Sequence, residues 1–287
     1  MSVYYQVNGQ QIHASEEGKA GKQLALLIHG WSSSWFAMSP LFSQFQRRYH
    51  CVAVDLPGYG QSPAGPERPT MDGYADILAG LIKQLSPKNP AVLVGHSMGG
   101  MISLTLAQRH PHLVERLVLL CPTISGRLSL FMNLFVSPNI MVERFVPTKI
   151  SSLLEPQLVG ISDRLMRPAS FSELGGVSEA DYNRLRADAR HPGQSRVRAE
   201  CFWAMRQGDL RGNLSGLKDI PILAIWGMED NTVPLRDASA LVDELPDVDL
   251  RILPKVSHWP QFESPDVTRR HIKAFLGTPM NLIQAIF

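Results

Sequence analysis

A serine lies between two glycines in the stretch Gly95-His96-Ser97-Met98-Gly99. An apolar run at residues 91–94 precedes it, and a second apolar segment at residues 101–106 follows it. The first run is typical of a buried strand and the second of a buried helix. A serine at so sharp a strand-to-helix turn is exposed at a helix N-terminus, whose amides favour a developing negative charge. We therefore predict that Ser97 is a nucleophile; the alternative is a glycine-rich turn that only joins the two elements.

A serine hydroxyl is a poor nucleophile at neutral pH and needs a base that is oriented by a carboxylate. Of the nine histidines, His258 is the one that follows the last predicted strand in a loop. Asp230 follows the apolar strand before it, and the adjacent Glu229 is the alternative acid. Asp55 also follows a strand, but it heads a Pro-Gly loop and we interpret it as structural. The order Ser97, Asp230, His258 is the one expected when a nucleophile sits on an open α/β sheet.

Acyl transfer also requires hydrogen-bond donors for the oxyanion that forms on the substrate. The backbone N–H of Met98, directly after the nucleophile, is the first predicted donor. The second is the backbone N–H of Trp31, in the His-Gly-Trp sequence that follows the first long apolar strand.

The elements that must position these residues alternate along the chain. Apolar strands are predicted near residues 24–28, 51–54, 91–94, 117–120, 222–226 and 250–253, after an N-terminal hairpin at 4–14. Helices are predicted near residues 36–47, 71–85, 235–245 and 265–276. This alternation indicates an α/β fold with a mostly parallel, doubly wound sheet. The rhythm stops after residue 122 and resumes at 215, so we predict a core of residues 1–122 and 215–287 and an inserted helical cap at 123–214.

Composition narrows the function classes. The 287 residues are 44% hydrophobic and 19% charged, and 28 Lys and Arg against 26 Asp and Glu give a net charge of +2. This balance fits a globular enzyme and gives no nucleic-acid footprint. No apolar stretch is long enough to span a membrane, and no secretory signal is visible, so we expect a cytoplasmic protein. The three cysteines, Cys51, Cys121 and Cys201, are expected to be free thiols.

The blocks LLIHGW, DLPGYGQS, LVGHSMGG, IWGMEDNTVP and SHWPQFE together resemble the α/β-hydrolase superfamily. The resemblance covers about residues 20–122 and 215–276. It implies an α/β-hydrolase fold with an inserted helical cap and a triad of Ser97, His258 and Asp230. We predict no cofactor and no metal, because the glycine patterns do not complete a nucleotide loop and no zinc-ligand spacing occurs.

Several reactions are known in this superfamily. Ser97 argues against dehalogenases and epoxide hydrolases, which would use an aspartate nucleophile. We predict a serine hydrolase that acts through an acyl-enzyme on carboxylic esters of small to medium, lipophilic substrates. The alternatives are a carbon–carbon bond hydrolase on diketone acids and a ligand receptor that retains the triad. His258-Trp259 also occurs in carbon–carbon hydrolases, and Arg196 or Arg198 could bind a substrate carboxylate, although a solvated helix face is the simpler explanation of these arginines.

The predicted substrate pocket combines aromatic residues of the core and of the cap: Trp31, Phe131, Phe135 and Trp259. The partner is therefore expected to be a small-molecule ester. The tail at residues 279–287 is unusually apolar, and we expect it to dock on its own core or on a second subunit, which would give a homodimer.

Overall fold

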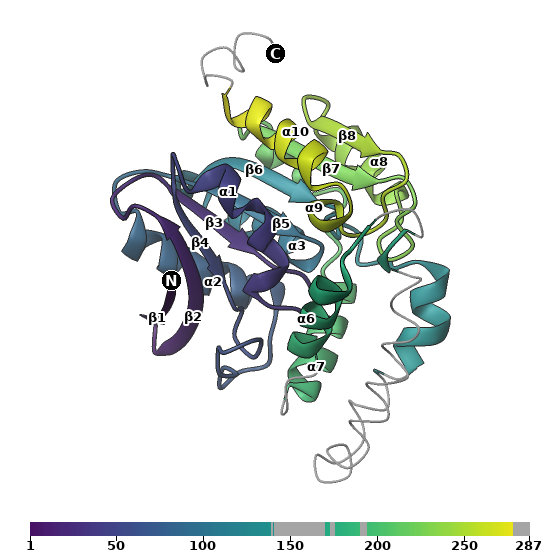
Figure 1. Ribbon diagram of the computed structural model, residues 1–287, viewed down its shortest axis with the longest axis horizontal. Coiled ribbons are helices and arrows are strands. Elements are labelled where there is room, and N and C mark those ends of the chain that lie inside the picture. Colours follow the sequence, from purple (N-terminus) through teal and green to yellow (C-terminus); the bar gives the residue numbers. More distant parts are fainter. Residues whose placement is uncertain (139, 141–169, 173–175, 190–193, 278–287) are drawn as a thin grey trace.

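The computed structural model describes residues 1–138, 140, 170–172, 176–189 and 194–277 (Figure 1). Its strands are β1 (Ser2–Val7), β2 (Gln10–Gly18), β3 (Leu24–Ile28), β4 (His50–Val54), β5 (Ala91–His96), β6 (Val114–Leu120), β7 (Ile222–Gly227) and β8 (Asp249–Leu253). Its α-helices are α1 (Phe42–Phe45), α2 (Met71–Leu85), α3 (Met98–Arg109), α6 (Glu179–Ala189), α7 (Ser195–Gln207), α8 (Arg236–Glu244), α9 (Pro260–Glu263) and α10 (Pro265–Gly277). Shorter helical turns are η1 (Trp35–Leu41), η2 (Pro111–Leu113), η3 (Met132–Val136) and η4 (Leu214–Leu217).

The strands form one sheet in the order β1-β2-β4-β3-β5-β6-β7-β8. The β1–β2 hairpin and the β2–β4 pair are antiparallel, and every other neighbouring pair is parallel. The predicted mostly parallel sheet is therefore confirmed. Strands β6 and β7 are neighbours in the sheet, with Leu117 opposite Ile222. Along the chain, residues 121–221 lie between them.

Helices cover both faces of the sheet (Figure 1). Alternate residues of a strand point to opposite faces, so Leu24 and Leu26 of β3 join a core with residues of α2, α3 and α8, whereas Leu27 joins a second core with residues of α1 and α10. Because both faces are buried, the central strands are continuous apolar runs rather than alternating ones. This is the doubly wound arrangement that the sequence predicts.

The predicted helix at residues 36–47 is wrong in its form. The structure divides it into the 3-10 turn η1, which contains Pro40, and the single-turn helix α1. A proline lacks the N–H that an α-helix needs from its interior residues, which explains the break. Among the described residues, no helix is long and apolar enough to cross a membrane.

The segment between β6 and β7, which contains η3, α6 and α7, contacts the loops that follow β3 and β8. The indole Nε1 of Trp31 donates to the carbonyl of Arg198 in α7 at 2.7 Å. The hydroxyl of Ser34 donates to Asp188 in α6, and the N–H of His258 donates to the carbonyl of Ser170 at 3.1 Å. Since these loops leave the carboxyl ends of their strands, the β6–β7 segment contacts the edge of the sheet where α/β proteins bind ligands.

Candidate active site

Ser97 occupies the turn between β5 and α3, with φ 54° and ψ −117°. This backbone conformation is rare for a residue with a side chain and costs about 1–3 kcal/mol. The fold fixes it from several sides: the N–H of Ser97 donates to the carbonyl of Leu120 at 2.9 Å, and its carbonyl accepts from the N–H of Gly100 at 2.9 Å and of Thr123 at 3.1 Å. The sharp strand-to-helix turn that the sequence predicts at Ser97 is therefore present, and the structure adds a strained backbone there.

The glycines around Ser97 permit close backbone contacts. A Cβ on Gly99 would lie 2.2 Å from the carbonyl oxygen of Ile28, and a Cβ on Gly95 would lie 2.4 Å from that of Gly99. A Cβ on Gly30 would lie 3.0 Å from the Cβ of Ser97. The loop after β3 thus runs directly beside the candidate nucleophile, and Trp31 is the next residue along that loop. This location is compatible with the predicted oxyanion donors at Trp31 and Met98.

Asp230 and His258 form a buried pair. One carboxylate oxygen of Asp230 lies 2.8 Å from Nδ1 of His258. The other accepts the backbone N–H groups of Thr232 at 2.8 Å and of Val233 at 2.9 Å, so the tight turn after β7 fixes the carboxylate. Because an ionised carboxylate can only accept, the proton of the neutral imidazole is assigned to Nδ1, which leaves Nε2 as an acceptor.

His96 links the His258 loop to the turn at Ser97. Its Nε2 lies 2.8 Å from the carbonyl oxygen of His258, and the two rings lie 4.9 Å apart. Burial, with the neighbouring His258 as a smaller contribution, lowers the pKa of His96 well below its ordinary value. In the described part of the chain no hydrogen bond joins the Ser97 hydroxyl to His258, a contact that in ligand-free sites often tightens only when substrate binds.

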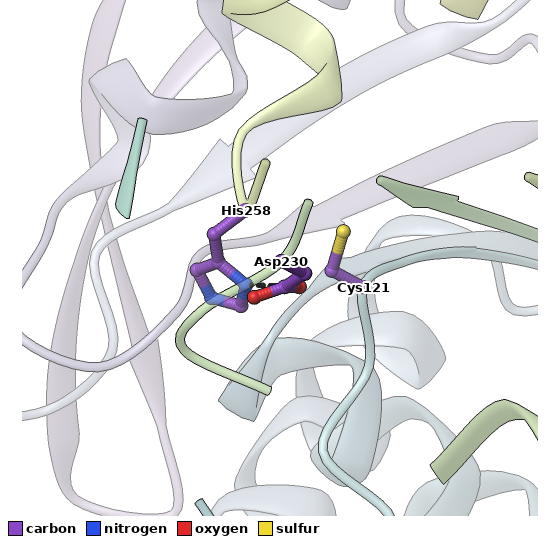
Figure 2. Close-up of side chains that lie close together, drawn as sticks. All are labelled: Cys121, Asp230 and His258. Carbon is purple, nitrogen blue, oxygen red and sulfur yellow. Dashed lines mark hydrogen bonds and ion pairs between the residues drawn. The ribbon is translucent and has the colours of Figure 1, made fainter. Parts of the chain in front are cut away.

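Figure 2 shows Cys121 beside this pair, at the end of β6. One potential ligand atom from each of Cys121, Asp230 and His258 lies within 4.8 Å of the other two. A cysteine binds metal as a thiolate, however, and burial raises the pKa of Cys121 well above its ordinary value. These residues therefore fit a hydrogen-bonded acid–histidine pair with a packed thiol better than a metal site.

A cavity lies between the β6–β7 segment and the core. Its apolar lining comes from both: Trp31, Val136, Ile140, Phe171, Leu185 and Trp259. Arg186 and Arg198 also line it, and Arg198 is buried. The cavity therefore combines an apolar wall with positive charge.

Two of the four predicted pocket residues, Trp31 and Trp259, line this cavity, and two do not. Phe131 and Phe135 contact each other at a ring distance of 5.0 Å, and Phe135 is 48% exposed. Val136, which is buried at the end of η3, lines the cavity instead. The sequence pattern could not separate these faces in a segment that is apolar on nearly every side.

The remaining acidic candidates are also resolved in space. Glu229 is exposed and accepts the hydroxyl of Ser172 rather than contacting His258. Asp55 is fully buried and accepts the N–H groups of Trp35 at 2.7 Å and of Gln61 at 2.9 Å, besides contacting His13. These contacts agree with a structural role for Asp55.

Sequence reasoning missed Glu263. It lies four residues beyond Trp259 on α9, and its carboxylate accepts backbone N–H groups from both sides of His258. No spacing rule singles it out, because the amides that it accepts come together only in the folded chain.

Comparison with known proteins agrees with this geometry. A family model described as the alpha/beta hydrolase fold matches residues 26–265. The chain belongs to the alpha/beta hydrolase family. The expected superfamily and fold are therefore confirmed.

Among curated relatives, the uncharacterized hydrolase YugF of Bacillus subtilis is 28% identical, over 95% of this chain and 96% of that protein. Pimeloyl-[acyl-carrier protein] methyl ester esterase of Chromobacterium violaceum is 28% identical, over 82% of this chain and 87% of its own. A 2-hydroxy-6-oxononadienedioate/2-hydroxy-6-oxononatrienedioate hydrolase of Pseudomonas sp is 24% identical, over 95% of this chain and 93% of that protein. Other relatives of similar identity are named epoxide hydrolases.

Among solved structures, a thermophilic esterase from Thermogutta terrifontis superposes with a TM-score of 0.78 at 20% identity. The match covers 96% of this chain and 98% of that one. At this identity the likeness concerns the fold, so the reaction must be argued from the site itself.

Proposed function

We propose that this hydrolase cleaves carboxylic esters through an acyl-enzyme on Ser97. The observation that carries the proposal is the buried Asp230–His258 pair, with 2.8 Å between the carboxylate and Nδ1. His96, which directly precedes Ser97 in the strained turn, contacts the carbonyl oxygen of His258 through its Nε2. An acid–histidine pair beside a serine on such a turn fits general-base activation of a hydroxyl. Because a serine stands at this position, we favour an acyl-enzyme over epoxide opening, which would use an aspartate nucleophile.

In the proposed reaction, the Ser97 hydroxyl attacks the ester carbonyl while Nε2 of His258 takes its proton. Asp230 holds the imidazole and stabilises its positive charge. The N–H groups of Met98 and Trp31 receive the oxyanion. The alcohol leaves with the proton from His258, and water then attacks the acyl-enzyme with the same histidine as base. The product carboxylic acid is released and Ser97 is regenerated.

The cavity favours lipophilic substrates. Its apolar wall, with Trp31 and Trp259 from the core and Phe171 from the β6–β7 segment, suits an acyl chain or an aromatic ring. If this cavity binds the acyl group, turnover should depend on acyl length. A flat profile from acetyl to octanoyl esters would reject this part of the proposal.

The decisive experiment compares wild type with Ser97→Ala on p-nitrophenyl esters of increasing acyl length. We expect sustained turnover in wild type and a loss of about 10³-fold or more in the variant. Asp230→Asn should also lose most activity, whereas Asp219→Asn, which changes an exposed carboxylate away from the site, should keep it. Turnover that survives in Ser97→Ala would overturn the proposal.

Carbon–carbon bond hydrolysis is the second candidate. Arg198 is buried and lines the cavity, where its charge could bind the carboxylate of a diketone acid. A relative of this chain is named for such a substrate. Cleavage of diketone acids without ester turnover would favour this reaction. Binding of a ligand without turnover of either substrate would favour the receptor alternative.

A further inference from the structure

Glu263 sits at the centre of the loop that carries His258. One carboxylate oxygen accepts the N–H of Trp259 at 2.9 Å, and the N–H of Ser257 lies 3.2 Å from this oxygen and 3.1 Å from the other. The two residues that flank His258 are therefore held by a single side chain. Hydrogen bonds to an ionised acceptor are about twice as strong as neutral ones, so this carboxylate can fix the direction of the loop.

The same carboxylate also holds the β6–β7 segment. Its second oxygen accepts the N–H of Ser172 at 2.7 Å. Two residues earlier, the carbonyl of Ser170 accepts the N–H of His258 itself at 3.1 Å. Ser170 and Ser172 are both buried. The residues at 170–172 are thus tied directly to the candidate base and to the carboxylate that supports it.

Phe171, between these two serines, forms part of the cavity wall. Its ring stacks on Trp259 at 5.7 Å with an interplanar angle of 8°. Both rings line the cavity, and Trp259 directly follows His258. A ligand that contacts this wall therefore touches a unit that includes the His258 loop.

The charge of the Glu263 carboxylate is stabilised by groups of the site. Burial raises the pKa of Glu263, and the three amides and the nearby His258 oppose this shift. In the described part of the chain no lysine or arginine forms an ion pair with it. The three backbone amides therefore stabilise this charge in place of a cation.

We infer that Glu263 is a positioning residue that couples the cavity wall at residues 170–172 to the placement of the His258 imidazole. The inference rests on the proposed function for the role of His258 as base. When residues 170–172 are in contact with Glu263, its carboxylate accepts amides of this wall and of the His258 loop, and the imidazole is held for proton transfer. When the Ser172 amide leaves, the carboxylate loses one of its three donors and the loop loses part of its support.

The test uses Glu263→Gln, which keeps the size of the side chain but replaces one acceptor oxygen with a donor. At least one backbone amide then faces an NH₂ group, which is also a donor. The hydrogen bond between that amide and residue 263 must therefore break. We expect kcat on the best ester to fall about tenfold or more, since small misplacements of a catalytic group are costly. KM should change less, and Glu263→Asp, which keeps the charge, should recover part of kcat.

Glu244→Gln is the matched control. Glu244 likewise accepts two backbone amides, of Gly212 at 2.7 Å and of Leu214 at 2.8 Å, but it lies on α8 away from His258. We expect this variant to lose stability with an unchanged kcat in the folded protein. If Glu263→Gln behaves in the same way, its role is only structural and the inference is wrong.

Hydrogen–deuterium exchange of the intact chain tests the coupling without any substrate. In Glu263→Gln the amides at 257–259 and at 170–172 should both exchange faster than in wild type. Faster exchange at only one of the two segments would overturn the coupling. Wild-type protein that hydrolyses no ester would refute the proposed function, whereas the exchange result would still decide whether Glu263 joins the two segments.

Discussion

At the scale of single residues, the site depends on side chains whose neighbours fix them before any ligand arrives. Asp230 rather than Glu229 contacts His258 because the amides of Thr232 and Val233 turn its carboxylate inward. The sequence places both acids after the same strand and cannot choose between them by chemistry alone. The order of the candidate residues along the chain follows from the strand ends. Glu263 could not be predicted, because one of its donors, Ser172, lies 91 residues away and no sequence pattern marks the two nearby amides.

The strained backbone at Ser97 predicts that two inactive variants differ in stability. Ser97→Gly and Ser97→Ala both remove the hydroxyl, but only glycine adopts φ 54° and ψ −117° without strain. We expect the glycine variant to be about 1 kcal/mol more stable than the alanine variant in urea unfolding, with both inactive. A glycine variant that is less stable than the alanine variant would contradict this expectation.

His96 predicts a pH dependence of stability. Because its pKa is lowered in the folded protein, the unfolded chain binds more protons below about pH 6.5. Its contribution to stability is thus complete above that pH and is lost as the pH falls toward the folded pKa. In His96→Gln the slope of unfolding free energy against pH should decrease in this range by up to about 1.4 kcal/mol per pH unit.

The measurement is urea unfolding of wild type and variant at a series of pH values between 5 and 8. His112→Gln, which changes an exposed histidine, serves as the control and should leave the slope unchanged. Identical slopes in wild type and His96→Gln would contradict the assignment of this pH dependence to His96.

At the scale of elements, the agreement between sequence and structure follows from local signals. The predicted helix at 71–85 matches α2 because Thr70 caps it, with its hydroxyl accepting the N–H of Gly73 at 2.9 Å, and because its apolar residues recur at helical spacing. The helix predicted at 36–47 fails at Pro40. In the β6–β7 segment, apolar residues occur on most faces of η3, so periodicity could not say which of them line the cavity.

The packing of α3 against β3 predicts a severe effect at Gly99. A Cβ there would lie 2.2 Å from a backbone carbonyl that cannot move without displacing the strand. We expect Gly99→Ala to destabilise the protein by about 2 kcal/mol or more and to abolish activity, as measured by thermal unfolding and ester turnover. Gly216→Ala adds a Cβ in open space and is the matched control, with little change expected. Normal stability in Gly99→Ala would mean that α3 can shift away from β3.

At the scale of the whole molecule, the core encloses all three cysteines. Cys51, Cys121 and Cys201 are free and buried, and burial raises the pKa of each, that of Cys201 to about 11. We expect a thiol reagent such as DTNB to leave the native protein unmodified and to react with three thiols after unfolding. Rapid reaction of one thiol in the native state would identify an element that opens without global unfolding.

The boundaries of the cap and the role of the C-terminal tail are two further expectations for the whole molecule. The predicted boundaries of the cap at 123–214 and the second-subunit role of the tail remain proposals, and the tail itself lies outside the described residues. Deletion of residues 278–287, followed by measurement of unfolding and of oligomeric mass, addresses the tail directly.

The pairing of β6 with β7 has a consequence for how the chain folds. Six strands of the sheet precede the β6–β7 segment, and two follow it. During synthesis β6 therefore emerges long before its partner, and its outer edge stays unpaired until the ribosome has made the entire segment. Closing so long a loop delays the last two strands and the acid–histidine pair that they carry. The nucleophile turn can thus form early in synthesis, whereas the groups that activate it arrive last.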